Sequence, residues 1–169
     1  MAREPGYLGL EWLRMTEDSA LVGLDISPDL IELARHNASE YGLDDRTEYV
    51  LGRGDELPFD DEAFDAVFTN GSLHEWAEPD ATLDEMWRVL RPDGRLFVCD
   101  LRRDMMPPVR WFLYFATKPR EIRPGLLTSI RAAYTPAEIE DLVARCAMCD
   151  CASVSRNPLG LTVTACKQA

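Results

Sequence analysis

The pattern of apolar and polar positions is clearest in the stretch LVGLDISPDLIELA, residues 21–34. Its first four residues, Leu21–Leu24, predict a short buried strand, and an acidic residue, Asp25, follows directly. Ser27 is a favoured helix N-cap, and the proline after it suits a first helical turn, where its missing N–H is not needed. Apolar residues then recur at helical spacing as far as Gly42. The stretch therefore predicts a strand, an acid at the strand end and a helix.

The same patterning predicts alternating strands and helices along the rest of the chain. Further helices are expected over residues 6–17, 80–90 and 135–149. Further strands are expected over residues 47–51, 64–69 and 95–99, with a closing hairpin of residues 152–156 and 161–166. The RPDG segment, residues 91–94, is expected to end a helix, and residues 104–134 are expected to be irregular. This alternation predicts a mostly parallel α/β sheet with helices on both faces, in a single domain of residues 1–169.

Composition and charge limit the function classes. The chain has 169 residues, of which 46% are apolar and 28% charged, as is typical of a soluble globular domain. Its formal charge of −12 repels phosphate backbones and anionic membranes, so neither nucleic acid nor a membrane is an expected partner. No apolar run approaches the ~20 residues of a membrane span, and no signal-peptide pattern is present. These features predict a cytoplasmic protein.

Three of the five cysteines lie close together in CAMCDC, residues 146–151. The odd number of cysteines argues against a disulfide framework. One interpretation is a soft-metal site completed by Cys166, and the other is a set of ordinary thiols at a helix end. The second paired cluster that makes zinc spacing specific is absent, so we predict no metal site.

The residues that follow the predicted strands are candidates for ligand binding, because open parallel sheets bind ligands at the carboxyl ends of their strands. These are Asp25 with Ile26, and residues 52–56, 70–76 and 100–104. An acid between a strand and a helix is typical of domains that hold the two hydroxyls of a ribose. The alternative is an ordinary strand–helix turn.

Four motifs in order resemble the class I S-adenosylmethionine-dependent methyltransferases, particularly the small-molecule enzymes of the ubiquinone and menaquinone biosynthesis type. They are GLDISPDLIELA, the GxxxELPF loop, FDAVFTNGSLHEW and the RVLRPDG turn before RLFVCD. The resemblance implies a Rossmann-like methyltransferase sheet with an antiparallel end. It also implies S-adenosylmethionine as cofactor and a small, apolar methyl acceptor.

The resemblance implies roles for particular residues. Asp25 would accept hydrogen bonds from both ribose hydroxyls, and Ile26 would lie against the adenine. The other cofactor-binding candidates are Gly6, Tyr7, Asp55, Glu56, Asn70, Gly71 and Ser72, of which the last three would line the methionine end.

His74 is the candidate general base, and its alternative role is packing or substrate shaping. Arg102, Arg103 and residues 104–134 would form a wall or lid beside the acceptor. The aromatic side chains of that segment suit an apolar acceptor, with core or dimer packing as the alternative. They are Trp111, Phe112, Tyr114 and Phe115.

The sequence departs from the family pattern in its first residues. Only Pro5 and Gly6 match the GxGxG loop, and Glu4 stands at a glycine position. The family's first strand, central in the sheet, has no counterpart before Tyr7, so we expect the flanking strands to close up or an association between chains to shield the gap. Arg53 stands where an acid often receives the adenine amino group, and Asp55 could substitute for it.

Three hypotheses follow. The first is methyl transfer to a small molecule. The second is a non-catalytic relic or interaction module that keeps the fold with impaired cofactor binding. The third, a dinucleotide oxidoreductase, requires a GxGxxG loop that the sequence lacks.

Overall fold

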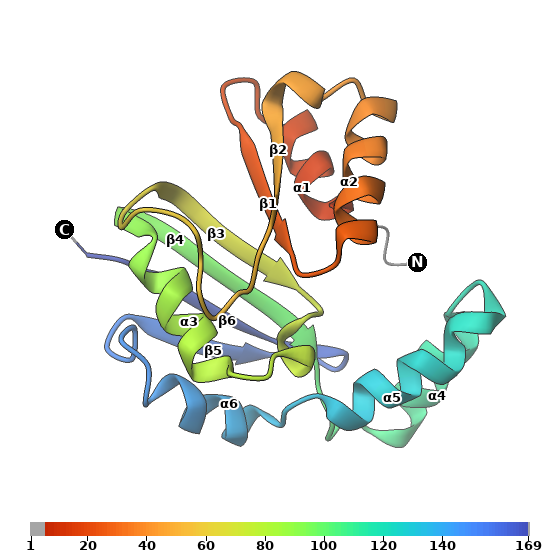
Figure 1. The fold of residues 1–169 in the computed structure, drawn as a ribbon. Coiled ribbons are helices and arrows are strands. Elements are labelled where there is room, and N and C mark those ends of the chain that lie inside the picture. The colour runs from red at the N-terminus through yellow and green to blue at the C-terminus, as the bar shows by residue number, and fades with distance from the viewer. Residues whose placement is uncertain (1–5, 169) are drawn as a thin grey trace. The chain divides into compact units, whose positions relative to one another are not determined.

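A computed structural model describes residues 6–168, which fold into two compact units, residues 6–54 and residues 55–168 (Figure 1). The described strands form two hydrogen-bonded sheets, a two-stranded one in the N-terminal unit and a four-stranded one in the C-terminal unit. Each unit combines strands with packed helices, so the α/β class is confirmed. The prediction of a single domain over residues 1–169 stays a prediction.

The N-terminal unit pairs two parallel strands and packs two helices on them. Its elements are α1 (Tyr7–Arg14), β1 (Leu21–Asp25), α2 (Pro28–Glu40), the short 3-10 helix η1 (Asp44–Arg46) and β2 (Thr47–Leu51). Leu21 lies opposite Thr47, and the register continues to Asp25 opposite Leu51. The core consists of buried side chains from both helices and from β2, including Leu10, Leu13, Ile31, Ala34 and Tyr49.

Helix α2 begins where the sequence predicts. The Ser27 hydroxyl accepts a hydrogen bond from the Leu30 N–H at 3.4 Å, and Pro28 occupies the first turn. Ile31 and Ala34 are buried on one face, as their spacing indicates. The predicted strand–acid–helix stretch is confirmed.

The C-terminal unit is built on a mixed sheet with the strand order β3-β4-β6-β5. Its strands are β3 (Phe64–Asn70), β4 (Leu90–Leu101), β5 (Ala152–Arg156) and β6 (Gly160–Cys166). Its α-helices are α3 (Pro79–Arg88), α4 (Pro107–Ala116), α5 (Arg123–Ala132) and α6 (Pro136–Val143), with 3-10 turns η2 (Leu73–Glu75) and η3 (Arg120–Ile122). β3 and β4 are parallel, whereas β6 runs antiparallel to both β4 and β5. The predicted C-terminal hairpin is confirmed.

The core of the C-terminal unit joins α3, α6 and the sheet. Leu83 and Met86 of α3, Leu96 and Val98 of β4, and Ile139 of α6 are all at most 5% exposed. On β4 the buried residues alternate with exposed ones, because successive side chains point to opposite faces of a sheet. One face of this sheet is therefore buried in the core.

The prediction that residues 91–94 form a turn outside the strand is wrong. They lie within β4 as a bulge, since Phe64 pairs with Leu90 while Ala66 pairs with Arg95. Asp93 adopts a left-handed conformation with φ 63°, which Asp tolerates better than most residues, and its N–H donates to the Lys167 carbonyl at 2.7 Å. The strand therefore continues through these residues.

Residues 104–134 are helical, which corrects the prediction that they are irregular. Pro107 and Pro108 lie in the first turn of α4, and Pro124 lies in the first turn of α5. Proline is compatible with this position because the first helical N–H groups have no partner within the helix. The prolines begin these helices and do not break them.

Helix α6 begins as predicted but ends earlier. Thr135 and Glu138 form a reciprocal capping box at its start. The helix ends at Val143, six residues before the predicted end, and the Ala147 N–H donates to Asp84 of α3 at 2.8 Å. This contact with a neighbouring helix directs the backbone away from a further helical turn.

The expectation about the first strand concerns, in part, residues 1–5. These residues, which include Glu4 and Pro5, lie outside the described part of the chain. Within residues 6–168, β1 pairs with β2 and β3 pairs with β4, and β1 and β3 do not pair with each other. The missing strand stays a prediction. No helix in the described part of the chain is long and apolar enough to cross a bilayer.

Candidate functional site

In the N-terminal unit, Asp25 stands at the carboxyl end of β1 in a fixed orientation. Its Oδ1 accepts a hydrogen bond from the Ser27 N–H at 2.8 Å. Its carbonyl accepts from the Gly52 N–H at 3.0 Å, which ties the loop after β2 to the same strand end. The Asp25 side chain is only partly buried, so the carboxylate is held by the backbone while its second oxygen can accept from a ligand.

Two exposed aliphatic side chains flank this carboxylate in the same unit. Ile26 is 67% exposed, and Leu51, which lies opposite Asp25 in the β1–β2 register, is 57% exposed. Apolar surface next to an oriented acceptor suits a ligand that has hydroxyl groups beside an apolar ring. Leu51 was missed from the sequence, although its position as the last residue of β2 could have indicated it.

Gly6 and Tyr7 lie at the start of α1. Gly6 is the N-cap of this helix with φ 81°, a left-handed conformation that favours glycine, and an added Cβ would lie 3.2 Å from the Tyr49 hydroxyl. The Tyr7 ring packs edge-on against Tyr41, with 5.4 Å between the centroids. A cofactor-binding role for either residue stays a prediction.

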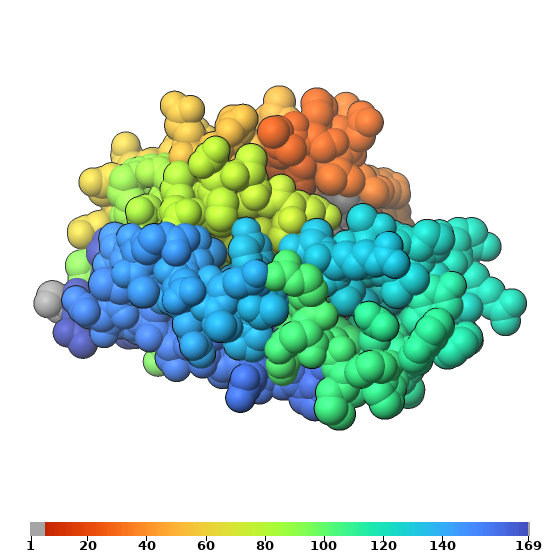
Figure 2. All heavy atoms as spheres, turned by 90° about the horizontal axis from the view of Figure 1, so that it is seen from below, coloured from red at the N-terminus to blue at the C-terminus, as the bar shows by residue number. Residues whose placement is uncertain are grey.

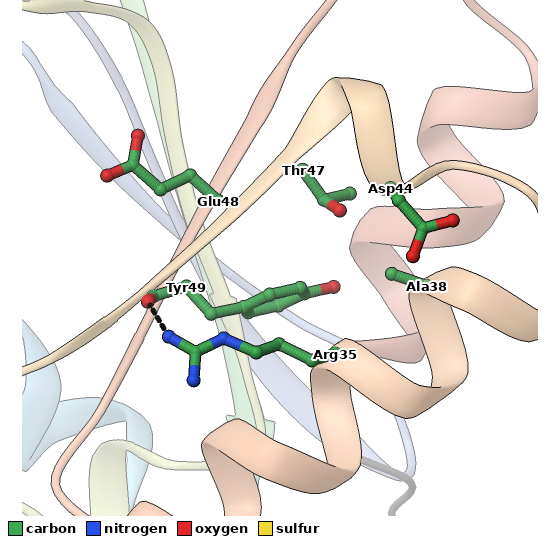
Figure 3. A pocket seen from close by; sticks show the side chains of 6 residues that line it. All are labelled: Arg35, Ala38, Asp44, Thr47, Glu48 and Tyr49. Carbon is green, nitrogen blue, oxygen red and sulfur yellow. Dashed lines mark hydrogen bonds between the residues drawn. The ribbon is translucent and has the colours of Figure 1, made fainter.

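A cavity of about 400 Å³ in the N-terminal unit lies between α2 and β2 (Figure 3). The Arg35 guanidinium crosses it and donates to the Tyr49 carbonyl at 2.9 Å. Burial raises the pKa of the Tyr49 phenol above its ordinary value. The side chains that line the cavity are Arg35, Ala38, Asp44, Thr47, Glu48 and Tyr49, and none of them is a predicted site residue.

In the C-terminal unit, His74 and Asp100 form a buried pair at the carboxyl ends of β3 and β4. The His74 Nδ1 lies 3.0 and 2.9 Å from the two oxygens of the Asp100 carboxylate. Each side chain is 2% exposed. His74 is held in place because Leu73, the preceding residue in η2, is 1% exposed and belongs to the core.

The carboxylate of Asp100 is surrounded by hydrogen-bond donors. The His74 main-chain N–H donates to its Oδ2 at 2.8 Å, and the Leu101 N–H donates to its Oδ1 at 2.7 Å. Since this group acts as an acceptor toward both backbone donors, Nδ1 is the imidazole nitrogen that carries a proton. In the neutral ring Nε2 then has the free lone pair.

The other imidazole nitrogen of His74, Nε2, has a lone pair that could accept a proton. It is buried and has no hydrogen-bond partner among the described residues, and the Glu75 Oε1 lies 3.6 Å away. A buried imidazole nitrogen usually has a partner, so this one is suited to receive a proton from a ligand. Asp100 belongs to residues 100–104, a strand-end segment that the sequence marks as a candidate for ligand binding, but its pairing with His74 was not predicted.

Asn70, Gly71 and Ser72 form the turn after β3. Gly71 adopts φ 72° and its N–H donates to the Cys99 carbonyl at 2.6 Å, which joins the ends of β3 and β4. The Ser72 hydroxyl lies 2.5 Å from that of Thr69. The structure thus brings these three residues to the same strand ends as His74, and their contact with a cofactor stays a prediction.

Asp55 and Glu56 begin a loop that α3 anchors. Glu85 accepts from the Leu57 N–H at 2.8 Å, and Arg88 donates to the Phe59 carbonyl at 2.9 Å and to that of Leu57 at 3.1 Å. The hydrogen bond from Arg88 holds the pKa of the Glu85 carboxyl below its ordinary value. The loop is therefore ordered without being part of a sheet or helix.

The cysteines are free thiols in this structure. Cys146 is buried, which raises the pKa of its thiol to about 11, whereas Cys149 is exposed. Within residues 6–168, no group of three or more His, Cys, Asp or Glu side chains is arranged to hold a metal ion.

Comparison with known proteins identifies the family. Residues 6–98 match the family described as "Methyltransferase domain". The chain is 37% identical over 117 residues to the demethylmenaquinone methyltransferase of Clavibacter sepedonicus, covering 68% of this chain and 46% of that protein. It is 34% identical over 105 residues to the ubiquinone/menaquinone biosynthesis C-methyltransferase UbiE of Hahella chejuensis (strain KCTC 2396), covering 62% and 42%. The chain belongs to the class I S-adenosylmethionine-dependent methyltransferases.

Solved structures confirm the Rossmann-like methyltransferase fold. A SAM-dependent methyltransferase from Aquifex aeolicus superposes with a TM-score of 0.71 at 18% identity, covering 96% of this chain and 77% of that one. The matches to the two curated relatives span less than half of the length of each.

Proposed function

We propose that the chain transfers the methyl group of S-adenosylmethionine to a small, apolar acceptor. The observation that carries this proposal is the Asp25 carboxylate, oriented by the Ser27 N–H at the end of β1 within the matched domain. An acid at this position of an α/β fold suits the paired hydroxyls of a ribose. The exposed Ile26 beside it suits the adenine ring.

The residues present fit this cofactor. Asp25 would hold the ribose, with Ile26 and Leu51 against apolar parts of the nucleoside. When bound, S-adenosylmethionine supplies an electrophilic methyl group on a sulfonium. The protein then has to align the acceptor and take up a proton, because an O–H, N–H or C–H acceptor loses one proton as it gains the methyl.

The proton would go to His74. Its Nε2 lone pair is available because Asp100 accepts the Nδ1 hydrogen bond, and the same contact stabilises the imidazolium formed when Nε2 takes up the proton. Asp100 acts here as a positioning residue. The names of the relatives favour a quinone-type acceptor, so a reduced demethylmenaquinone is the first acceptor to assay.

Calorimetric titration with S-adenosylmethionine tests the cofactor half of the proposal. We expect saturation at micromolar ligand for the native chain and loss of that binding in Asp25→Ala. The competing hypothesis of a non-catalytic relic, favoured by Arg53 in place of an acid, predicts no saturation up to millimolar ligand.

Transfer of radiolabelled methyl groups tests the catalytic half. His74→Gln should lower kcat by about a hundredfold to ten-thousandfold, with KM little changed, because general-base catalysis contributes factors of this size. The matched control is His36→Gln, since His36 is the other histidine and is exposed on α2. A packing role for His74 would instead leave the pH–rate profile of the variant unaltered.

A further inference from the structure

The outward face of α4 is apolar, although a surface helix normally exposes polar residues. Pro108, Trp111, Phe112 and Phe115 recur at the i, i+3, i+4, i+7 spacing of one helix face. Trp111 is 53% exposed, Phe112 is 69% exposed and Phe115 is 62% exposed. No residue of α4 is buried. We call these four residues the α4 aromatic face.

The α4 aromatic face is held rigid by contacts among its rings. Trp111 stacks on Phe115 with 5.8 Å between centroids, and Tyr114 packs edge-on against each. Arg123 lies over the Tyr114 ring at 5.3 Å and donates to the Phe115 and Thr117 carbonyls at the end of the helix. The exposed rings therefore lose little conformational entropy when they become buried.

The charge around this face is opposite to that of the whole chain. Residues 106–132 contain five arginines and lysines and one glutamate, a formal charge of +4, whereas the chain carries −12. None of the five cations forms an ion pair with another described residue. They are Arg110, Lys118, Arg120, Arg123 and Arg131.

A small cavity joins α4 to α5 next to the aromatic face. It has a volume of about 170 Å³ and brings two guanidinium groups, Arg110 and Arg131, beside the Trp111 and Tyr114 rings. Paired arginines beside aromatic rings suit an anionic headgroup such as a phosphate ester. In Figure 2 the green-to-cyan atoms of residues 106–132 form one continuous block next to the blue atoms of α6.

We propose that α4 and α5 dock this protein on an anionic lipid surface. The aromatic face would enter the headgroup boundary, where Trp and Phe are favoured, while the surrounding cations contact the lipid phosphates. This proposal departs from the expectation based on net charge. Charges more than about 10 Å apart are largely screened at physiological salt, so the local +4 governs this contact.

A second copy of the chain is a poorer occupant of the face. Pairing two α4 aromatic faces would bring two segments of charge +4 together. A ten-residue helix is only about 15 Å long, so its single face provides much less than the ~800 Å² per partner of a stable interface.

Flotation of the full chain with lipid vesicles tests the proposal. We expect co-flotation with phosphatidylglycerol-rich vesicles and at least about tenfold weaker association with pure phosphatidylcholine vesicles. The triple variant Trp111→Ser/Phe112→Ser/Phe115→Ser and the pair Lys118→Glu/Arg120→Glu should each reduce the association about tenfold or more. Leu159→Ser and Arg95→Glu are matched controls, since both residues are exposed outside residues 106–132 and should not matter.

Several outcomes would overturn the proposal. These are no flotation with anionic vesicles, equal association with both lipids, or flotation that the α4 variants leave unchanged. Loss of a dimer in the triple variant, seen by light scattering without vesicle binding, would assign the face to a second copy. Vesicle binding needs neither cofactor nor turnover, so its failure is distinguishable from failure of the proposed methyl transfer.

Discussion

Asp25 and Asp100 occupy equivalent places in their own units, yet their surroundings differ. Each stands at the carboxyl end of a parallel strand. Asp25 accepts one hydrogen bond from the Ser27 N–H and is partly exposed, whereas Asp100 is buried and accepts from the His74 ring, the His74 N–H and the Leu101 N–H. The Asp25 carboxylate can still accept a hydrogen bond from a ligand, whereas the Asp100 carboxylate already accepts hydrogen bonds from groups of the protein.

An aspartate at the end of a strand can therefore serve two different purposes. A carboxylate with an available oxygen can recognise hydroxyl groups, whereas a fully engaged carboxylate orients a neighbouring side chain. Variants of Asp25 should therefore change ligand affinity more than stability, and variants of Asp100 should change stability and the orientation of His74.

The largest effect is expected for Asp100→Ala. It leaves two main-chain N–H groups and the His74 Nδ1–H without their buried acceptor, which should lower the free energy of unfolding by about 3 kcal/mol. Urea denaturation followed by circular dichroism measures this change. Asp104→Ala, which removes an exposed partner of Arg102, is the control and should cost less than about 1 kcal/mol.

Asp25→Ala should have the opposite effects, with a large loss of ligand affinity and a small loss of stability. The loss of hydrogen bonds from two ribose hydroxyls to a charged acceptor should weaken S-adenosylmethionine binding about a hundredfold, equivalent to about 2.7 kcal/mol. The same variant should unfold within about 1 kcal/mol of the native chain. A stability loss as large as that of Asp100→Ala would remove the distinction between the two aspartates.

Gly160→Ala tests the position of Asp100 from the opposite strand. Gly160 pairs with Leu101, and an added Cβ would lie 2.4 Å from the Asp100 carbonyl oxygen. The resulting backbone shift should destabilise the chain by about 2 kcal/mol and disturb the His74–Asp100 contact. Denaturation and the His74 ring chemical shifts report the two effects. Gly125→Ala, at a position where an added Cβ meets nothing within 4 Å, is the control.

The smallest effect is expected for Glu85, whose carboxyl pKa lies below its ordinary value. Because Arg88 lowers the pKa of Glu85, this group contributes stability above about pH 4.5, and the contribution is lost as the pH falls through the lowered pKa. Glu85→Gln should cost about 1 kcal/mol at pH 7, with a difference that shrinks in acid. Urea denaturation of both chains at pH 7 and at a pH below 4.5 measures this difference in the free energy of unfolding. Asp65→Asn, in an exposed pair with Arg91, should show no such trend.

Local signals in the sequence predicted the strand–acid–helix stretch, the C-terminal hairpin and the start of α6, because capping residues and apolar spacing act within a few residues. The end of α6 could not be predicted in this way, since Asp84 of another helix accepts the Ala147 N–H. The helices of residues 104–134 were not predicted, although Pro107, Pro108 and Pro124 are compatible with a first helical turn. A tertiary contact therefore explains the end of α6, whereas the starts of α4 and α5 are local features of the sequence.

The candidate site, too, could be predicted from the sequence only in part. His74 could be chosen from the sequence as the histidine in a strand-end segment. Its partner Asp100 lies 26 residues away in the sequence, on β4, so only the folded sheet shows that the two side chains form a pair. The charge of residues 106–132 was hidden in a net value of −12 for the whole chain.

Arg88 holds the loop after Gly54 at several points. Its guanidinium donates to the Leu57 and Phe59 carbonyls and to the carboxylates of Glu85 and Asp61. Removing this one side chain would release three acceptors of the loop at once and leave the Leu57 N–H bonded to Glu85, so most of the loop would gain conformational entropy in one cooperative step and not residue by residue.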